Sequence, residues 1–504
     1  MQTQTTICLN NQNIHSLPES ISVPTYDRSK VTAGIVHVGV GGFHRSHEAF
    51  YTDAYMAQSG DLSWGICGVG LRDADRKMQS LLKQQDYLYT LIVRHPNGTI
   101  ENKVIGCLTD FLLGCDDPMA VINKMASEET KIVSLTITEG GYNFNPVTGE
   151  FDFTNPDVIH DLANPDKPRL VFGYLIAALK LRFEKGLAPF TIQSCDNVQH
   201  NGDVAKKMVI DYAHAVDSDL ADWIESEVSF PNAMVDRITP ATTPEDISYL
   251  QTLGIKDEWP VTCEPFHQWI IEDKFTLTRP QWEQVGAQFV SDVTPYEKMK
   301  IRLLNAGHSV LGILGSLYGF DTIDESVQDP LFAEFLRHFM DIEVTPILSP
   351  VPGINLEEYK DTLLERFANP NIKDSLARIC SENAAKLSTF MLPTIANNLA
   401  KNGEIQCATL VIAAWCYYSD KQTDLQGKPL TISDAMADEV HQLASQTSER
   451  SGALLELKSI FSGLSNSEKF VAAYTAQVEA LYSTPNVKQH MQAVLSECKL
   501  GQAS

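Results

Sequence analysis

The order of apolar and polar positions in the first 290 residues predicts strands that alternate with helices. Short apolar runs typical of buried strands occupy residues 34–38, 63–69, 131–138 and 190–195. Helical patterns are clearest over residues 47–56 and 171–185. Residues 87–93 and 99–108 flank a Pro-Asn-Gly turn, as two antiparallel strands of a hairpin would. The pattern therefore predicts an α/β domain with added strands.

The second part of the chain has a different pattern. Beyond residue 293 the strand signals thin out, and helical patterns dominate as far as residue 500. We place the domain boundary near residue 290. The chain is thus expected to contain an α/β domain over residues 1–290 and a predominantly α-helical domain over residues 291–504.

Composition favours a globular protein with a small-molecule partner. The chain has 504 residues, 43% of them hydrophobic, and a formal net charge of -25. Such a charge repels nucleic-acid phosphates and anionic membranes. The longest apolar run, residues 408–418, is about half the length of a membrane-spanning helix, and the amino terminus lacks the features of a signal peptide. A cytoplasmic location with reduced cysteines is the expectation.

A glycine turn follows the first buried strand. Residues 39–44 read Gly-Val-Gly-Gly-Phe-His and precede a helix-like segment, which is the order of a Rossmann-type, dinucleotide-binding unit. Gly39 and Gly41 fit the G-x-G pattern, but His44 stands where a third glycine is usual. The alternative is a turn that only reverses the chain. The candidate cofactor-binding residues are Val38, Gly39, Val40, Gly41, Gly42, Phe43, His44 and Arg45.

Acidic residues follow the second strand, where an NAD ribose would be held. Asp75 is the candidate, and its carboxylate favours NAD over NADP. Arg72, Arg76 and Lys77 could instead neutralise a 2′-phosphate. The other alternative is that Asp75 caps the following helix.

Two further strand ends carry polar residues, and a polar pair stands in a later apolar segment. Glu139 follows one strand and is succeeded by two glycines, and Asn197 follows another. Ligands collect at the carboxyl ends of parallel strands. Asn197 could donate a hydrogen bond to a substrate oxygen, or it could serve turn chemistry. Asp236 and Arg237 stand between apolar residues, where they could bind substrate or form a structural salt bridge.

The segment 296–308 places four polar residues in an apolar, helical setting. On a regular α-helix with Lys300 at zero, Glu297 falls at about 60°, His308 at about 80° and Asn305 at about 140°. They would share one face. Apolar neighbours predict that the helix is buried, and burial tends to lower the pKa of a lysine, as a general base requires. A structural polar cluster is the alternative.

Five blocks of sequence, together with Lys300, Asn305 and His308, match a known pattern. The blocks are Gly-Val-Gly-Gly-Phe-His-Arg at 39–45, Thr-Ile-Thr-Glu-Gly-Gly-Tyr at 136–142, Ser-Cys-Asp-Asn at 194–197, Pro-Asn-Ala-Met-Val-Asp-Arg-Ile-Thr-Pro at 231–240, and Asp-Ile-Glu-Val-Thr-Pro at 341–346 before Pro-Val-Pro-Gly at 350–353. With these blocks the chain resembles the long-chain polyol-specific dehydrogenases, in particular their mannitol-oxidising branch. The resemblance covers residues 28–485.

The resemblance implies a metal-independent, NAD-linked interconversion of D-mannitol and D-fructose by hydride transfer at C2. By position, Lys300 would be the general acid/base for the C2 hydroxyl, and Asn197 and Asn305 would hold the C2 oxygen. Glu297 would let the proton out, and Glu139 would lie near the nicotinamide. The residues expected to orient the polyol are His308, Asp236, Arg378 and Lys386, with Arg237 beside Asp236 in the substrate-binding set.

Other activities remain open at this point. Fructuronate reductase (mannonate oxidoreductase) shares the lysine chemistry, and arabinitol or another polyol could be the substrate. A non-catalytic NAD-binding protein would not need Lys300, Asn305 and His308 together. Family members often carry two acids at positions 74 and 75, whereas Ala74 precedes Asp75 here, which bears on cofactor preference. The oligomeric state is open, and a monomer is compatible with the sequence.

Overall fold

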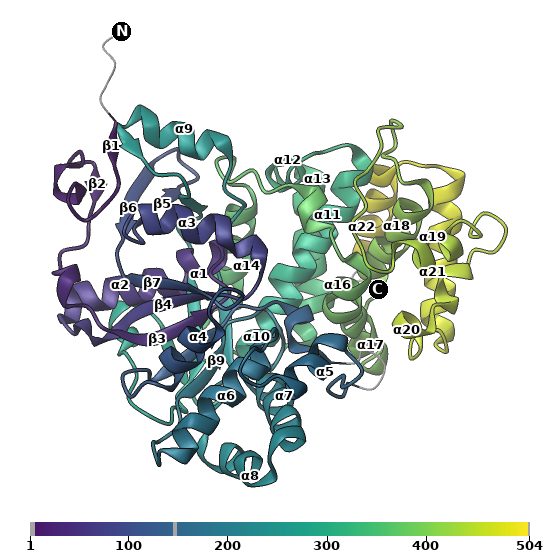
Figure 1. Cartoon of the computed structure of the whole chain (residues 1–504). Helices are drawn as coiled ribbons and strands as arrows, with labels where there is room; N and C mark the ends of the chain where they lie inside the picture. Colours follow the sequence, from purple (N-terminus) through teal and green to yellow (C-terminus); the bar gives the residue numbers. More distant parts are fainter. Residues whose placement is uncertain (1–5, 145–148, 502–504) are drawn as a thin grey trace. The chain divides into compact units, whose positions relative to one another are not determined.

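The chain is divided into two compact units, Met1–Thr294 and Pro295–Ser504. The computed structural model describes residues 6–144 and 149–501 (Figure 1). The ends of both predicted domains, residues 1–5 and 502–504, lie outside this description. The first unit contains all the described strands, and the described part of the second consists of helices and connections. The predicted fold classes, α/β followed by mainly α-helical, are confirmed.

A five-stranded parallel sheet forms the centre of the first unit. Its order is β7-β4-β3-β8-β9, so the first strand of the series lies in the middle and the chain winds outward to both sides, as in a Rossmann fold. The strands are β3 Ala33–Val38, β4 Gly65–Gly70, β7 Leu108–Leu113, β8 Ile132–Leu135 and β9 Thr191–Ser194.

The strands are apolar because both faces of the sheet are covered. Val36 and Val38 point into a core that α4, α6, α7 and α8 share, while Ile35 points into a second core that includes α2. Figure 1 shows these helices around the sheet. The helices of the first unit are α1 Gly42–Ser46, α2 Glu48–Ser59, α3 Arg76–Gln84, α4 Pro118–Ala126, α5 Pro156–Ala163, α6 Val171–Glu184, α7 Asn201–Val216, α8 Ser218–Glu227 and α9 Pro244–Thr252.

Three smaller sheets supply the added strands. The predicted hairpin is confirmed, because β5 Tyr89–Arg94 pairs antiparallel with β6 Ile100–Ile105. These two strands join β2 and β12 in a mixed sheet of order β12-β5-β6-β2. The remaining strands are β12 Val261–Cys263, β2 Ile21–Ser22, β10 Ala233–Asp236, β13 Gln268–Glu272, β14 Gln288–Val290, β1 Ile7–Cys8 and β11 Ile255–Lys256.

Two buried helices organise the second unit. α11 Ala306–Tyr318 and α18 Gln406–Lys421 pack against each other, and both are apolar nearly all round. No helix in residues 6–144 or 149–501 is long and apolar enough to cross a membrane. The other helices are α10 Thr294–Lys300, α12 Ile323–Gln328, α13 Pro330–His338, α14 Leu356–Phe367, α15 Leu376–Ile379, α16 Asn383–Phe390, α17 Leu392–Ala400, α19 Ala437–Ala444, α20 Lys458–Phe461, α21 Glu468–Ser483 and α22 Val487–Gly501.

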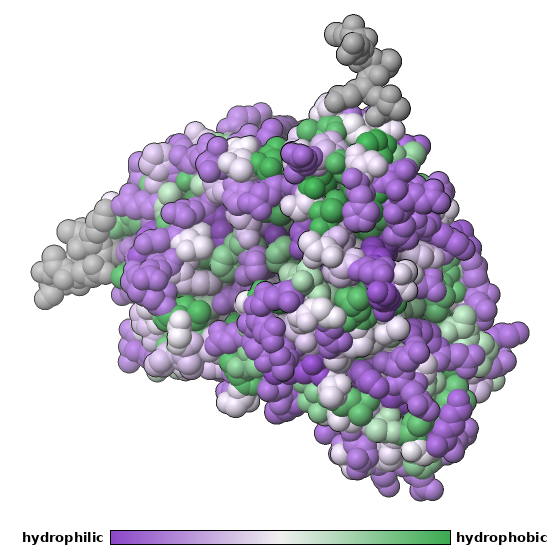
Figure 2. All heavy atoms as spheres, turned by 90° about the vertical axis from the view of Figure 1, so that its left-hand side faces the viewer, coloured by the Kyte–Doolittle hydropathy of each residue, from purple (hydrophilic) through white to green (hydrophobic). Residues whose placement is uncertain are grey.

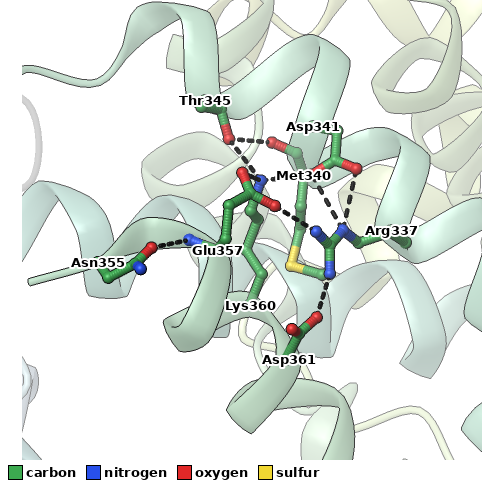
Figure 3. A network of polar contacts seen from close by, with 8 residues as sticks. All are labelled: Arg337, Met340, Asp341, Thr345, Asn355, Glu357, Lys360 and Asp361. Carbon is green, nitrogen blue, oxygen red and sulfur yellow. Dashed lines mark hydrogen bonds and ion pairs between the residues drawn. The ribbon is translucent and has the colours of Figure 1, made fainter.

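An ion-pair network joins α13, the π-helical turn Phe339–Val344 and α14 (Figure 3). Arg337 binds Asp341, Glu357 and Asp361, and the almost fully buried Lys360 binds Asp341 and Glu357. A buried ammonium needs such partners, because an unpaired charge is costly away from water. The network fixes α14, whose last turn reaches the candidate site.

The face of the molecule drawn in Figure 2 is mainly polar. Figure 2 shows one face, on which hydrophilic residues predominate and hydrophobic residues lie scattered among them. The formal net charge of -25 agrees with this character.

Glu343, in the same π-helical turn, caps the amino end of α18. Its carboxylate accepts hydrogen bonds from the backbone N–H groups of Cys407 at 2.5 Å and Ala408 at 2.9 Å. Burial raises the pKa of Glu343 to about 7, although both N–H groups favour the ionised form. This carboxyl therefore changes charge near neutral pH in the folded protein.

Glu343→Gln should flatten part of the pH dependence of stability. The folded-state pKa of about 7 lies above the ordinary value of 4.5. The contribution of Glu343 to the free energy of unfolding is therefore fully present below pH 4.5 and is lost as pH rises through about 7. Over this pH range the free energy of unfolding of the wild type should fall by on the order of 3 kcal/mol more than that of the variant. Urea unfolding at several pH values measures this difference. The exposed Glu439→Gln is the control and should keep the wild-type slope; an equal slope in Glu343→Gln would contradict the assignment.

Candidate functional site

The carboxyl ends of the central strands form one edge of the sheet. Val38 at the end of β3 pairs with Val69 of β4 and with Leu135 of β8, and Leu135 pairs with Ser194 of β9. The segments that follow these strands, which carry the glycine turn, Asp75, Glu139 and Asn197, therefore leave the sheet along the same edge. Sequence order had predicted this convergence.

Gly39 sets the conformation of the glycine turn. Its φ is +96°, a left-handed value, and a Cβ at this position would lie 2.1 Å from the Thr136 carbonyl oxygen. A Cβ on Gly41 would meet only the Gly39 carbonyl oxygen, at 3.8 Å. The space beside Gly41 is thus open, as a phosphate cradled by backbone would require.

The side chains of His44 and Arg45 point into the protein. His44 Nδ1 lies 3.1 Å from Glu48 Oε2, and burial lowers the pKa of His44 to about 4. Arg45 donates to the Trp259 carbonyl at 2.6 Å, and its guanidinium lies 5.1 Å from the ring centre of Tyr89. Both residues were predicted to bind cofactor. Their side chains instead serve the interior, which leaves only their backbone for that role.

Asp75 occupies the position expected of a helix cap. Its Oδ2 accepts a hydrogen bond from the Arg72 backbone N–H at 3.0 Å. Arg76 binds Asp116 and Asp73, so two carboxylates already balance its charge. Lys77 lies over the Trp259 ring at 5.2 Å. Of the cationic residues Arg72, Arg76 and Lys77, the last two are therefore engaged in other contacts.

Asp196 holds the segment that carries Glu139. The buried Asp196 carboxylate accepts from the backbone N–H groups of Ile137 at 3.1 Å and Thr138 at 2.7 Å, and from the Tyr142 hydroxyl at 2.7 Å. Thr138 has φ +62°, an unfavourable value for a β-branched residue. Burial raises the pKa of Asp196 despite these bonds. Glu139 itself is exposed.

The other residues predicted in the first unit differ in burial. Asn197 is exposed directly after Asp196, and Asp236 is buried at the end of β10. Arg237 donates to the carbonyls of Ser46 at 2.6 Å and Glu264 at 3.1 Å, and its guanidinium lies over the ring of Phe50. These contacts give Arg237 a structural task in the first unit.

The segment 296–308, which carries the predicted polar residues, is not one regular helix. α10 ends at Lys300, a π-helical turn covers Ile301–Asn305, and α11 begins at Ala306. The expected angles assumed an α-helix throughout and are corrected here. Because a π-turn bonds residues five apart, it brings Asn305 closer to the side of Lys300 than an α-helix would, and such turns are frequent at functional sites.

His308 lies among four positive side chains of the second unit. Burial lowers the pKa of His308 well below its ordinary value, and the charges of Arg378, Arg366, Lys300 and Lys386 lower it further. The ring is therefore neutral at pH 7. Its buried Nε2 has no hydrogen-bond partner among the described residues, and the ring lies 4.7 Å from that of Phe367. The neutral imidazole can accept or donate a hydrogen bond to a ligand.

The remaining predicted residues of the second unit lie near this histidine or in the segment that precedes it. Lys300, Asn305 and Glu297 are all buried, which confirms the predicted burial of the helix. Arg378 is paired with Asp374, and Lys386 donates to the Ile379 carbonyl at 2.9 Å.

The comparisons with known proteins agree over nearly the whole chain. The family model for the mannitol dehydrogenase Rossmann domain matches residues 33–284, and that for the mannitol dehydrogenase C-terminal domain matches residues 292–482. A mannitol 2-dehydrogenase of Pyrenophora tritici-repentis is 45% identical over 94% of this chain and 84% of its own length.

Two solved structures are similar as well. A Pseudomonas fluorescens mannitol 2-dehydrogenase, in a ternary complex with NAD and D-mannitol, is 46% identical with a TM-score of 0.90, covering 97% of this chain and 100% of that one. A D-sorbitol dehydrogenase in substrate-free form is 36% identical with a TM-score of 0.87, covering 96% and 100%.

A Rossmann-type unit followed by a helical unit, each matched by a dehydrogenase family model, defines this chain as an oxidoreductase of the two-domain dehydrogenase class. The chain belongs to the mannitol dehydrogenase family.

Several residues that contact the candidate site residues were not predicted. Asp196 was read only as part of a strand end, and Arg366 and Phe367 were not singled out. His37 lay inside an apolar strand. Nothing in their local sequence marks them, because their contacts join segments far apart in the chain.

Asp196→Asn should loosen residues 137–142. One carboxylate oxygen becomes a donor that faces N–H or O–H groups, so at least one buried donor loses its acceptor, at about 1–3 kcal/mol. Urea unfolding should show that loss, and amide hydrogen exchange of residues 137–142 should accelerate. The half-exposed Asp157→Asn, which breaks a surface ion pair with Arg169, should cost under about 0.5 kcal/mol. Equal effects of the two variants would rule out this role for Asp196.

Proposed function

We propose that this chain is an NAD-dependent, metal-independent dehydrogenase that interconverts D-mannitol and D-fructose. The observation that carries the proposal is the buried Lys300 next to a π-turn that ends at Asn305, with the neutral His308 one turn further along. The relatives named above support the substrate and the cofactor. In this proposal residues 1–290 bind the dinucleotide and residues 291–504 bind substrate.

The first unit offers a fitting cradle for NAD. The left-handed Gly39 and the open space beside Gly41 suit a pyrophosphate held by backbone amides. Residues 38–45 would provide that backbone, Asp75 would hold the ribose, and Glu139 would lie near the nicotinamide. When bound, NAD supplies the hydride acceptor.

The amino-acid side chains would supply proton transfer and charge stabilisation. Lys300 would accept the proton of the C2 hydroxyl during oxidation and return it during reduction. Asn305 and Asn197 would each donate a hydrogen bond to the reacting oxygen as negative charge develops there. Glu297, three residues before Lys300, would pass the proton on.

Polyol hydroxyls would be oriented by uncharged and charged groups. His308, held neutral, would bind one hydroxyl, and Arg378, Lys386 and Asp236 would bind others. Arg237 is proposed to support Asp236, since its guanidinium already binds backbone carbonyls.

Fructuronate reduction is the second candidate. The four positive side chains around His308 are the observation that favours it, because they would attract the carboxylate of a uronate.

A substrate and cofactor panel should separate these activities. We expect the highest kcat/KM with D-fructose and NADH, and lower values with fructuronate, D-arabinitol and NADPH. The Asp75 carboxylate should repel a 2′-phosphate while Arg76 is held by two acids. Nicotinamide absorbance follows each reaction. Higher kcat/KM with fructuronate than with fructose would assign the second candidate instead.

Lys300→Ala should lower turnover by about 10²–10⁴-fold, the usual contribution of a general base. The dissociation constant of NADH should change less than about twofold, since the dinucleotide is proposed to bind the first unit. Lys298→Ala is the matched control, because Lys298 is exposed on the same helix. Near-normal turnover of Lys300→Ala would refute the assignment.

A further inference from the structure

A buried polar cluster lies beneath the glycine turn. His37 of β3 has its Nδ1 at 3.0 Å from Glu48 Oε2 and at 2.8 Å from the Ser134 hydroxyl. Its Nε2 lies 2.9 Å from the Thr136 hydroxyl and 3.3 Å from the Gly39 carbonyl oxygen. His44 stacks on His37 with ring centres 3.4 Å apart. His37, His44, Glu48 and Ser134 are almost fully buried.

The two histidines and Glu48 bring potential metal ligands together. One ligand atom from each lies within 4.8 Å of the others. The ring planes, however, are inclined by only 11° and are stacked. A metal ion binds an imidazole nitrogen close to the ring plane, and one ion cannot lie near both of two stacked, parallel planes. The cluster therefore needs another explanation.

The hydroxyl contacts suggest where the protons lie. When the Ser134 hydroxyl donates to Glu48 Oε2 at 2.9 Å, its oxygen accepts from His37 Nδ1. When the Thr136 hydroxyl donates to the Gly39 carbonyl at 2.7 Å, its oxygen accepts from His37 Nε2, which also lies 3.3 Å from that carbonyl. In this arrangement both nitrogens of His37 face acceptors, and each carries a proton.

The neighbouring charges agree with this assignment. Burial acts to raise the pKa of Glu48, but hydrogen bonds from His37 and His44 outweigh it and hold the pKa well below its ordinary value. Burial and the charge of His37 lower the pKa of His44 to about 4, so His44 is neutral. With both nitrogens of His37 protonated, the cluster is a buried His37–Glu48 ion pair with a neutral ring stacked on it.

The cluster meets the glycine turn at one carbonyl. Thr136 and His37 both direct hydrogen bonds at the Gly39 oxygen. In a trans peptide the C=O and the next N–H point in opposite directions, so the Val40 N–H points away from the cluster. Within the described residues that N–H makes no hydrogen bond.

We propose that His37, as an imidazolium paired with Glu48, is a positioning residue for dinucleotide binding that fixes the Gly39–Val40 peptide with its N–H free for the pyrophosphate. This inference rests on the proposed NAD-dependent function. The ion pair is neutral as a whole, so it orients the peptide and adds no long-range attraction.

The test compares His37→Gln and Glu48→Gln with wild type. A glutamine amide cannot donate at both ends, so His37→Gln should raise the NADH dissociation constant about tenfold, measured by fluorescence titration. Turnover at saturating NADH should change less than about twofold, because His37 touches no reacting atom. His160→Gln is the control, since His160 also pairs with an acid, Asp161, and should leave affinity unchanged.

Glu48→Gln should weaken NADH binding similarly, and the double variant should be no worse than either single one, because both residues act through one peptide. Additive effects, or affinity of His37→Gln within twofold of wild type, would overturn the proposal.

The protonation state is measured on the wild-type protein itself. ¹⁵N spectra of labelled histidines at pH 7.5 should show one imidazolium signal that disappears in His37→Gln; if that variant does not fold, loss of the signal in Glu48→Gln decides. A neutral His37 would overturn the proposal. If wild type binds no NADH, the proposed function fails, whereas normal wild-type binding with an unaffected His37→Gln defeats this inference alone.

Discussion

The close approach of two backbone segments at Gly39 is the constraint on which the edge of the central sheet depends. No side chain fits between Gly39 and the Thr136 carbonyl, so the turn after β3 and the segment after β8 lock together. From there polar contacts continue in both directions. Thr136 and His37 bind the Gly39 carbonyl, and Asp196 binds the next two backbone amides beyond Thr136. A displacement of any one strand end would disturb all the others.

Buried carboxylates hold the irregular segments of both units. Asp196 binds two backbone amides of a strained segment, Glu343 binds two at the start of α18, and Glu48 binds two histidines. Burial raises the pKa of Asp196 and Glu343, while the pKa of Glu48 is lowered. The donors explain the difference, because the hydrogen bonds from His37 and His44 outweigh the burial of Glu48, whereas the backbone amides do not outweigh the burial of Asp196 and Glu343.

Most of the fold was predictable from sequence, whereas the site was predictable only in part. The apolar run of β3 predicted a strand buried on both faces, with Val36 and Val38 in one core and Ile35 in the other. The Pro-Asn-Gly turn predicted its hairpin. Lys300, Asn305 and His308 were visible because polar residues in an apolar helix are rare. The π-helical turn between Lys300 and His308 was not visible, since the same residues could equally form a regular α-helix with about 3.6 residues per turn. His44 and Arg45 were assigned to the cofactor because local sequence does not reveal whether a side chain points inward.

The sequence by itself determined the order of strands and helices, the change to helices near residue 290, and which residue types follow each strand. Local patterning suffices for this, because burial imposes the periods of strand and helix on neighbouring residues. Only the tertiary structure decided that His37 meets Glu48 and Gly39, that Arg366 joins the charges around His308, and that Asp196 supports Thr138. These contacts join chain segments brought together by packing, and a hydrogen bond depends on distance and direction, which no spacing along the chain encodes.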